Sequence, residues 1–409
     1  MQESTQSSIR GTPILAELSL KPIFLTPSSP KSFALDADIK MLQTQASLVS
    51  VIIPAYNAQQ LIARTLMSVL NQTYRHLEVW VVDDGSRDRT AEIVQAIAKQ
   101  DDRVRLLQQP NAGVASARNL GIRSAQGEFI ALIDSDDLWY PDALGKLVAQ
   151  FQRSLPAVGV IYAWSVDIDE QDRPIGGFHA AAINGHVYRT LICHNFLGNA
   201  SATLIRKDCL DRIGGYDTQL KAQKAQGCED WDLYLRLAEH YEFGVVPEFL
   251  IGYRKVASSM SMDFSQMARS QQFMLQSIQK NHPELSGYLY RLSRSSFYLY
   301  LAQQCDVYGD ARETLGWLWQ AIKADPITSM GRLGLYLLLI KNLAKLAGES
   351  WQLFRMWTLF MPQRLPIKDL LMNESFSTPI YPLSLPIHPL KIWLKVMVGS
   401  FLHQSVSKI

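Results

Sequence analysis

The chain has 409 residues, of which 47% are hydrophobic and 19% are charged, and this composition excludes a disordered or fibrous protein. Its net charge of +2 gives no general reason to expect binding to nucleic acid. The length exceeds that of one ordinary domain and predicts two or three folded units. The four cysteines have no CxxC spacing, so we expect neither a zinc site nor a disulfide framework, and a reducing cytoplasm is the expected setting.

We expect four regions along the chain. Residues 1–46 mix Ser, Thr, Gln and Pro without a sustained period and are expected to form a flexible N-terminal extension. Residues 47–265 carry strand and helix patterns in alternation and are expected to form one α/β domain. Residues 266–326 have a helical composition and would form an accessory region. Residues 327–409 form an apolar tail with nine Lys or Arg against three acids.

Short apolar strands alternate with amphipathic helices in the first part of the α/β domain. The strand patterns lie at 48–53, 77–82, 104–107 and 128–133. Such alternation is typical of βαβ units, and it predicts a mainly parallel sheet flanked by helices. Loops that follow parallel strands meet at one edge of the sheet, which is where open α/β sheets bind ligands.

The fourth strand pattern ends in the sequence Asp134-Ser135-Asp136-Asp137, with three carboxylates in four positions. Like charges so close repel one another unless a cation lies among them, so the cluster favours a divalent metal site. Taken alone, a solvated turn before the helix that begins near Pro141 explains the cluster equally well. The other loops at the same edge favour the metal site.

Two of these loops follow the first and second strand patterns. Pro54, Tyr56 and Asn57 follow the first, and Asp83 and Asp84 follow the second. No GxGxxG or Walker sequence occurs, so neither a dinucleotide oxidoreductase nor a P-loop phosphotransferase is supported. Carboxylates beside an aromatic ring instead suit a nucleoside diphosphate whose oxygens complete the coordination of Mg²⁺ or Mn²⁺.

Four motifs follow one another in this part of the chain. They are Val51-Ile52-Ile53-Pro54-Ala55-Tyr56-Asn57, Val82-Asp83-Asp84-Gly85-Ser86, Asn111-Ala112-Gly113 with Ala117-Arg118-Asn119, and Asp134-Ser135-Asp136-Asp137. In this order they resemble family 2 glycosyltransferases of the GT-A fold. The resemblance implies a Rossmann-like mixed, mainly parallel sheet flanked by helices, here with a C-terminal helical accessory region. It also implies sugar transfer from a nucleoside-diphosphate sugar, a UDP-sugar in first place, to a hydroxyl of a glycan or lipid-linked acceptor.

The resemblance implies a role for residues in each motif. The implied donor contacts are Pro54, Tyr56, Asn57, Asp83, Asp84, Asn111, Gly113, Arg118, Asp134 and Asp136. Asp136 and Asp137 would bind the metal, although another alignment of the family pairs Asp134 with Asp136, so the roles of the three acids stay open. Two alternatives also stay open, an inward-facing Asp83 that fixes its loop and an ion pair between Arg118 and the acidic loops.

A second group of motifs follows further along the chain. A Gly-Gly turn ends a predicted helix, where glycine favours a left-handed cap, and Glu229 and Asp230 begin the next helix, where the dipole favours acids. By the resemblance, Asp230 is the base that takes the proton of the acceptor hydroxyl. A single base fits an inverting transfer, which the resemblance also implies. The residues implied on the acceptor side are Gly215, Tyr216, Glu229 and Trp231.

Two further segments bear on the site. Residues 166–194 have no clear period and are expected to form a loop or a small hairpin over it. The strand pattern at 249–255 leads to Ser259-Met260-Ser261, where family members often carry a nearby His. No His occurs here, which weakens a metal role for this loop, and Arg254 and Lys255 remain expected phosphate contacts.

Apolar and aromatic residues alternate with Lys and Arg in the tail, at 334–346 and at 390–401. This pattern favours peripheral contact with anionic lipid at the inner face of a membrane, with a buried helix face as the equal alternative. No run of 18 apolar residues occurs, so we expect no spanning helix. We expect a cytoplasmic enzyme of cell-surface or extracellular polysaccharide synthesis with no nucleic-acid partner. The alternatives are a nucleotidyltransferase acting on sugar phosphates and a non-catalytic sugar-nucleotide scaffold at the membrane.

Overall fold

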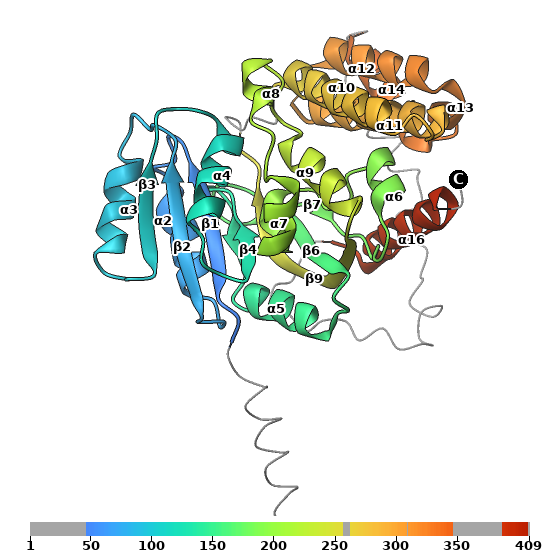
Figure 1. Ribbon diagram of the computed structural model, residues 1–409. Coiled ribbons are helices and arrows are strands. Elements are labelled where there is room, and N and C mark those ends of the chain that lie inside the picture. The colour runs from blue at the N-terminus through green and yellow to red at the C-terminus, as the bar shows by residue number, and fades with distance from the viewer. Residues whose placement is uncertain (1–45, 257–261, 309, 347–386, 408–409) are drawn as a thin grey trace, which may run out of the picture. The chain divides into compact units, whose positions relative to one another are not determined.

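The computed structural model describes residues 46–256, 262–308, 310–346 and 387–407 (Figure 1). The predicted N-terminal extension, apart from Ala46, lies outside the described residues. So does the part of the tail between 347 and 386. The domain boundaries therefore stay predictions, although α10 (Phe264–Asn281) begins close to the predicted boundary at 265.

The first half of the sheet is parallel. Its strands are β1 (Val49–Ala55), β2 (Leu77–Asp83), β3 (Val104–Gln108) and β4 (Phe129–Leu132). They lie in the order β3-β2-β1-β4, and each neighbouring pair is parallel. The connecting helices are α2 (Ile62–Leu70), α3 (Thr90–Ala98) and α4 (Val114–Ser124). The carboxyl ends of β1, β2 and β4 therefore meet at one edge, as the strand and helix patterns predict.

The second half of the sheet mixes the two directions. Its strands are β5 (Leu138–Trp139), β6 (Val158–Ile168), β7 (Pro174–His179), β8 (Thr203–Arg206) and β9 (Glu242–Arg254). β8 lies antiparallel between β4 and β6, while β6 and β9 form a long parallel pair. β7 folds back on β6 as an antiparallel hairpin, and β5 pairs with β9. The predicted mixed, mainly parallel sheet is confirmed, and the segment between 166 and 194 contains the predicted hairpin.

Each face of the sheet is covered by helices, because β1 is buried on both sides. Val51 and Ile53 face one core with α2, α3 and α5 (Ala143–Arg153), while Ile52 faces the other. The helices of the second core include α4, α6 (Tyr188–Cys193), α7 (Lys207–Ile213) and α9 (Glu229–Ala238). A strand with buried residues on both faces is typical of a parallel sheet between two helical layers.

The accessory region is helical, as its composition predicts. Its helices are α10, α11 (Gly287–Tyr308) and α12 (Ala311–Ala324). The described part of the predicted tail is helical too, with α13 (Pro326–Met330) at the boundary and α14 (Leu333–Leu346) after it. α16 (Pro389–Val406) returns to the α/β domain beside α6, where Thr190 Oγ1 and His403 Nδ1 lie 2.7 Å apart (Figure 1). Among the described helices, none is long and apolar enough to cross a membrane.

Candidate active site

Asp84 holds the loop before α4 in place. It is 4% exposed, and its carboxylate accepts hydrogen bonds from the backbone amides of Ala112 and Gly113, each at 2.8 Å. Gln109 Nε2 donates a further bond at 2.7 Å. The Asn111 side chain donates to the Asp84 carbonyl, so the second and third motifs form one connected loop pair. Gly113, with φ of +94°, begins α4 in a conformation that favours glycine.

Asp83 faces inward, which agrees with the alternative in which this residue fixes its own loop. Its carboxylate accepts from the Ser86 amide and from Gln108 Nε2, both at 3.1 Å. Asn57, with φ of +50°, connects this loop to the one after β1, because its amide donates to Ser86 Oγ at 2.9 Å. Tyr56 beside it is 49% exposed and is free to lie against a flat ring. The loops after β1 and β2 thus form one edge with an aromatic face.

The three acids after β4 have different surroundings. The Asp137 side chain is fully buried and accepts from Ser201 Oγ at 2.5 Å and from the Arg254 amide at 2.8 Å. Its predicted metal contact would require these bonds to break. Within the described residues, no hydrogen bond from another residue reaches the Asp136 carboxylate. Burial, together with the charge of Asp134, raises the pKa of Asp136 to about 6.

The carboxylates of Asp134 and Asp136 suit a divalent cation that prefers oxygen ligands. Asp136 lies close to the charge of Asp134, which Arg254 offsets only in part, and a cation between the two carboxylates would relieve both the repulsion and the cost of burial. Across the described ranges, no group of three or more His, Cys, Asp and Glu side chains is arranged to hold a metal ion. A metal site here would therefore need oxygens from the donor diphosphate.

Arg118 joins the acidic loop to the start of α9. Its Nη2 donates to Asp134 Oδ1 and its Nη1 donates to Asp230 Oδ1, both at 2.6 Å. The guanidinium is 4% exposed, and its Nε has no hydrogen-bond partner among the described residues. The ion-pair alternative for Arg118 is therefore the arrangement that the structure has, and it brings Asp134 and Asp230 into one site.

The two carboxylate oxygens of Asp230 differ: one accepts two hydrogen bonds, and the other accepts none from the described residues. Oδ1 accepts from Arg118 and from the Tyr216 hydroxyl, the latter at 3.0 Å. No described residue donates to Oδ2, and the side chain is 26% exposed. Burial raises the pKa of Asp230, while Arg118 and the Tyr216 hydroxyl oppose the rise. A partly exposed carboxylate with a raised pKa and a free oxygen can accept a proton from a bound hydroxyl.

The turn at Gly215 positions Tyr216. Asn119 Oδ1 accepts from the Tyr216 amide and Asn119 Nδ2 donates to its carbonyl, both at 2.8 Å. Gly215 has φ of +73°, and a Cβ there would lie 2.6 Å from Asn119 Oδ1, so both its conformation and the space require glycine. The Gly-Gly turn thus ends a helix and also orients a partner of Asp230.

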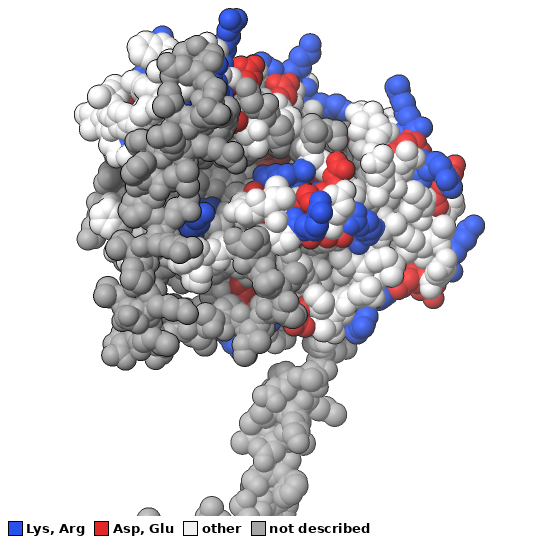
Figure 2. Space-filling model, turned by 180° about the vertical axis from the view of Figure 1, so that it is seen from behind, with Lys and Arg blue, Asp and Glu red and all other residues white. Residues whose placement is uncertain are grey.

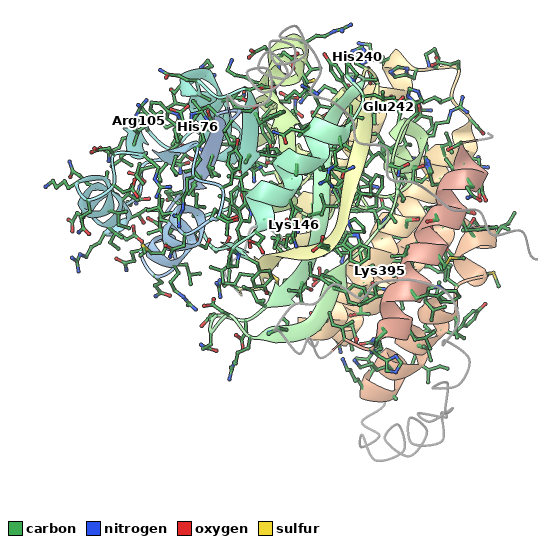
Figure 3. All side chains as sticks on the ribbon, turned by 90° about the horizontal axis from the view of Figure 1, so that it is seen from below. His76, Arg105, Lys146, His240, Glu242 and Lys395 are labelled. Atoms are coloured by element: carbon green, nitrogen blue, oxygen red, sulfur yellow. The ribbon has the colours of Figure 1, made fainter. Side chains whose placement is uncertain are left out.

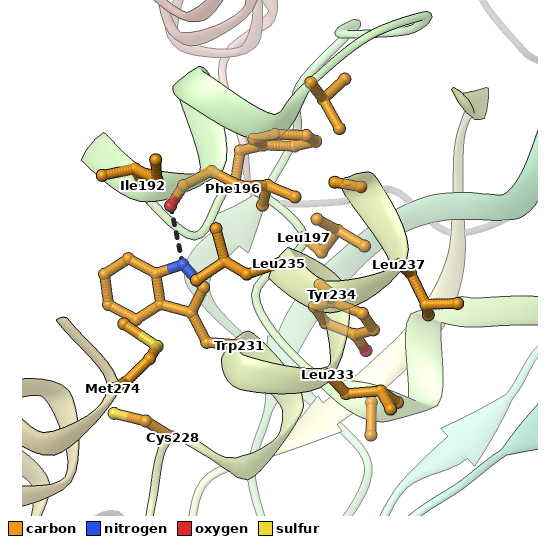
Figure 4. Close-up of a cluster of buried hydrophobic side chains, with 14 of the residues drawn as sticks. Ile192, Phe196, Leu197, Cys228, Trp231, Leu233, Tyr234, Leu235, Leu237 and Met274 are labelled. Atoms are coloured by element: carbon orange, nitrogen blue, oxygen red, sulfur yellow. Dashed lines mark hydrogen bonds between the residues drawn. The ribbon is translucent and has the colours of Figure 1, made fainter. Parts of the chain in front are cut away.

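The other two residues predicted on the acceptor side lie deeper. Glu229 is 5% exposed and accepts from the Gly227 amide at 2.7 Å, and its Oε1 has no partner among the described residues. Trp231 lies in the core, where its indole donates to the Leu191 carbonyl at 2.7 Å and packs near Cys228 and Met274 (Figure 4). Because its indole lies in this core, none of its described contacts supports the predicted role on the acceptor side, which stays a prediction.

The contacts of Arg254 differ from the phosphate contact that the sequence predicts for it. Its Nε donates to the Asp136 carbonyl at 2.6 Å, and its guanidinium also bonds the Asp169 carbonyl and Asp172 at the tip of the β6–β7 hairpin. The side chain is fully buried. Arg254 therefore fixes the hairpin to the acidic loop, and each of its three guanidinium nitrogens donates a hydrogen bond within the protein. The contact was missed because nothing local in the sequence pairs a strand end with a hairpin 82 residues earlier.

Comparison with known proteins agrees with this geometry. A model described as glycosyl transferase family 2 matches residues 50–214. Chondroitin synthase of Escherichia coli is 33% identical over 194 residues, which are 47% of this chain and 26% of that protein. Hyaluronan synthase of Pasteurella multocida is 31% identical over 198 residues, which are 48% of this chain and 19% of that protein.

One similar solved structure is mannosyltransferase PcManGT from Pyrobaculum calidifontis in complex with GDP-Man and Mn²⁺. Its sequence is 22% identical and the TM-score is 0.45, and the match covers 81% of this chain and 90% of that chain. The chain spans about a fifth to a quarter of the length of the two synthases. The match to the family 2 glycosyltransferase model lies within the α/β part of the chain and confirms the resemblance that the motifs predict.

Proposed function

We propose that this protein is an inverting, metal-dependent glycosyltransferase that moves a sugar from a nucleoside-diphosphate sugar to a hydroxyl of a glycan or lipid-linked acceptor. The observation that carries the proposal is the bridge from Asp134 through Arg118 to Asp230. It sets the open oxygen of one carboxylate beside the acidic loop, which is the arrangement that direct displacement at a sugar carbon needs. The nucleotidyltransferase and scaffold alternatives have no such supporting observation.

In the proposed reaction, Asp230 Oδ2 takes the proton of the acceptor hydroxyl as the new bond to the anomeric carbon forms. Arg118 and Tyr216 hold Oδ1 and so fix the direction of Oδ2. Because one base acts and no nucleophile intervenes, the configuration at the anomeric carbon inverts. A bound Mg²⁺ or Mn²⁺ would neutralise charge on the leaving diphosphate. Asp136 and Asp134 are the residues that we propose hold it.

For the donor, we propose that the edge formed by the loops after β1 and β2 receives the nucleotide base and ribose. The exposed Tyr56 ring offers a face for stacking, while Asp84 keeps the loop at Asn111 and Gly113 in place. A UDP-sugar is the first candidate. The names of the synthase relatives support a role in cell-surface or extracellular polysaccharide synthesis, which we also propose.

A thermal-shift series tests the donor directly. The full chain is melted with UDP-, GDP- and dTDP-sugars, each with and without Mn²⁺, because a ligand that binds the folded state raises the melting temperature. We expect the UDP-sugar with Mn²⁺ to give the largest shift. The matched control is Arg103→Lys, which alters an arginine–aspartate pair at the start of β3 and should leave the shift unchanged. No shift with any of the nucleotides would contradict the proposal.

We also propose that the tail contacts the inner face of the cytoplasmic membrane. α14 exposes apolar residues at helical spacing, and its exposed stripe consists of Leu333, Tyr336, Ile340, Leu343 and Leu346. Flotation of the full chain with phosphatidylglycerol liposomes tests this contact. We expect the triple variant Leu333→Gln, Ile340→Gln, Leu343→Gln to float less. Equal flotation of the variant and the parent protein would contradict a role for α14.

A further inference from the structure

Four titratable side chains from distant parts of the chain meet beside the site. They are Asp167 on β6, His179 on β7, Lys255 after β9 and Lys395 on α16. Lys255 Nζ lies 4.0 Å from Asp167 Oδ2, and His179 Nε2 lies 3.9 Å from Asp167 Oδ1. Gly177 makes room for the carboxylate, since a Cβ there would lie 2.1 Å from Asp167 Oδ2. We call these four residues the lysine cluster.

Both lysines are oriented by the protein. Lys395 lies on the side of α16 that faces the sheet (Figure 3), where its ammonium donates to the Phe178 carbonyl and lies 4.6 Å from the centre of the Phe178 ring. Lys255 Nζ lies 4.2 Å from the centre of the Tyr253 ring. Each ammonium can donate three hydrogen bonds. Among the described residues, the bond from Lys395 to the Phe178 carbonyl is the only one that either ammonium donates. Several donors are therefore available to a ligand.

The lysine cluster carries more positive than negative charge. Burial, followed by the nearby charges of Lys395 and Lys255, lowers the pKa of His179 well below its usual value, so His179 is neutral at pH 7. Two ammonium groups then share the single carboxylate of Asp167. Partial loss of hydration lowers the pKa of both lysines, although Lys395 is exposed along much of its side chain; Asp167 opposes the fall for both, and the charge of Lys255 lowers the pKa of Lys395 further. An anion between the two ammonium groups would neutralise this excess positive charge.

The lysine cluster adjoins the acidic loop without being part of it. Lys255 follows Arg254, whose amide donates to Asp137, so the two lie on opposite faces at the end of β9. The negative charge of Asp137 is near enough to oppose the fall in the pKa of Lys255. An anion bound by the lysines would thus lie next to the site and apart from the carboxylates that we propose for the metal.

The outer side of α16 is apolar. Its exposed apolar residues are Trp393, Leu394, Met397, Val398 and Phe401. The other side packs on the domain through Ile392 and Val396, so the helix has apolar residues on both sides. No acidic residue occurs in α16. Elsewhere, the face seen in Figure 2 carries Lys and Arg close to Asp and Glu. A basic helix with an exposed apolar side suits the membrane interface.

We propose that Lys255 and Lys395 bind a phosphate group carried by a membrane lipid, as the anchoring group of a lipid-linked acceptor. The inference rests on the proposed function and names its acceptor class. Lysine is a common phosphate ligand, and here the apolar side of α16 would hold the lipid surface beside the two ammonium groups. The glycan of such an acceptor would extend from the lysine cluster towards Asp230.

Vesicle binding by the full chain tests the proposal. The probes are phosphatidylcholine vesicles that contain either phosphatidic acid, a phosphate monoester, or phosphatidylserine. We expect the parent protein to prefer phosphatidic acid. Lys395→Gln and Lys255→Gln should remove that preference. The matched control is Lys391→Gln, which removes the same charge one helical turn before Lys395, at another exposed position of α16, and should weaken binding to both vesicles by about fivefold at most while keeping the preference.

Two outcomes would overturn the proposal. If Lys391→Gln and Lys395→Gln weaken binding to both vesicles equally, α16 acts only as a general basic surface. If inorganic phosphate raises the melting temperature of the parent protein but phosphatidic acid is not preferred, the site takes soluble phosphate and the lipid assignment is wrong. The melting temperature of each variant without ligand shows that it has folded. Asp230→Asn should bind vesicles like the parent protein, which separates this inference from the catalytic proposal.

Discussion

Replacing Arg118 by Lys should slow transfer more than it weakens donor binding. The guanidinium makes two charge-assisted hydrogen bonds at 2.6 Å, to Asp134 and to Asp230, and a single ammonium cannot reproduce both in the same geometry. Loss of one such bond costs about 1.5–3 kcal/mol, which corresponds to a fall in kcat of about 10- to 150-fold if the bond is needed in the transition state. The two carboxylates are 26% and 30% exposed, so water compensates in part and we expect a stability loss of only about 1–2 kcal/mol.

The assay measures kcat and the KM for the donor, together with the melting temperature. Arg103→Lys is the control, because Arg103 also makes a paired contact with an aspartate, at 2.7 and 3.0 Å, but at the start of β3. It should lower the melting temperature while leaving kcat unchanged. If Arg118→Lys instead raises the donor KM with kcat unchanged, Arg118 contacts the diphosphate and does not position Asp230.

Three further changes have expected outcomes. Tyr216→Phe removes a hydrogen bond that lowers the pKa of Asp230, so the fall of kcat at acid pH should move to higher pH; an unmoved profile would remove Tyr216 from the site. Asp136→Asn should raise the melting temperature of the metal-free protein, because it removes a buried like-charge contact, and should abolish the thermal shift with Mn²⁺; a retained shift would contradict the metal assignment. Gly121→Ala places a Cβ 2.4 Å from Ile52 Cγ2 and should destabilise the domain by about 1–3 kcal/mol, as measured by urea unfolding; an unchanged unfolding midpoint would contradict the close packing of α4 on β1.

The parallel half of the sheet could be predicted because its signals are local. Strands β1 to β4 are short apolar runs that end in polar loops, and a helix follows each of the first three strands, as the alternating pattern predicts. The antiparallel position of β8 between β4 and β6 could not be predicted, since β8 has the same apolar pattern as its parallel neighbours. Pairing direction depends on how distant segments pack, and a local period does not contain that information.

The sequence motifs name the residues of the candidate site but only some of the contacts among them. The motifs selected Asp84, Arg118 and Asp230 by residue type and order. Their partners depend on contacts between segments far apart in the chain, such as Arg118 with Asp230, 112 positions away. Trp231 follows Asp230 directly in the sequence, yet adjacent helical residues point in directions about 100° apart, and its indole lies in the core.

Single-turnover transfer by Asp230→Asn tests the central claim most directly. Asn keeps the size of the side chain and can still accept from Arg118, but it cannot take a proton. We expect the rate of sugar transfer to fall by about 10²- to 10⁴-fold, the usual contribution of a general base, while the donor-induced thermal shift stays as in the parent protein. Transfer at the parental rate with unchanged donor binding would show that Asp230 is not the base.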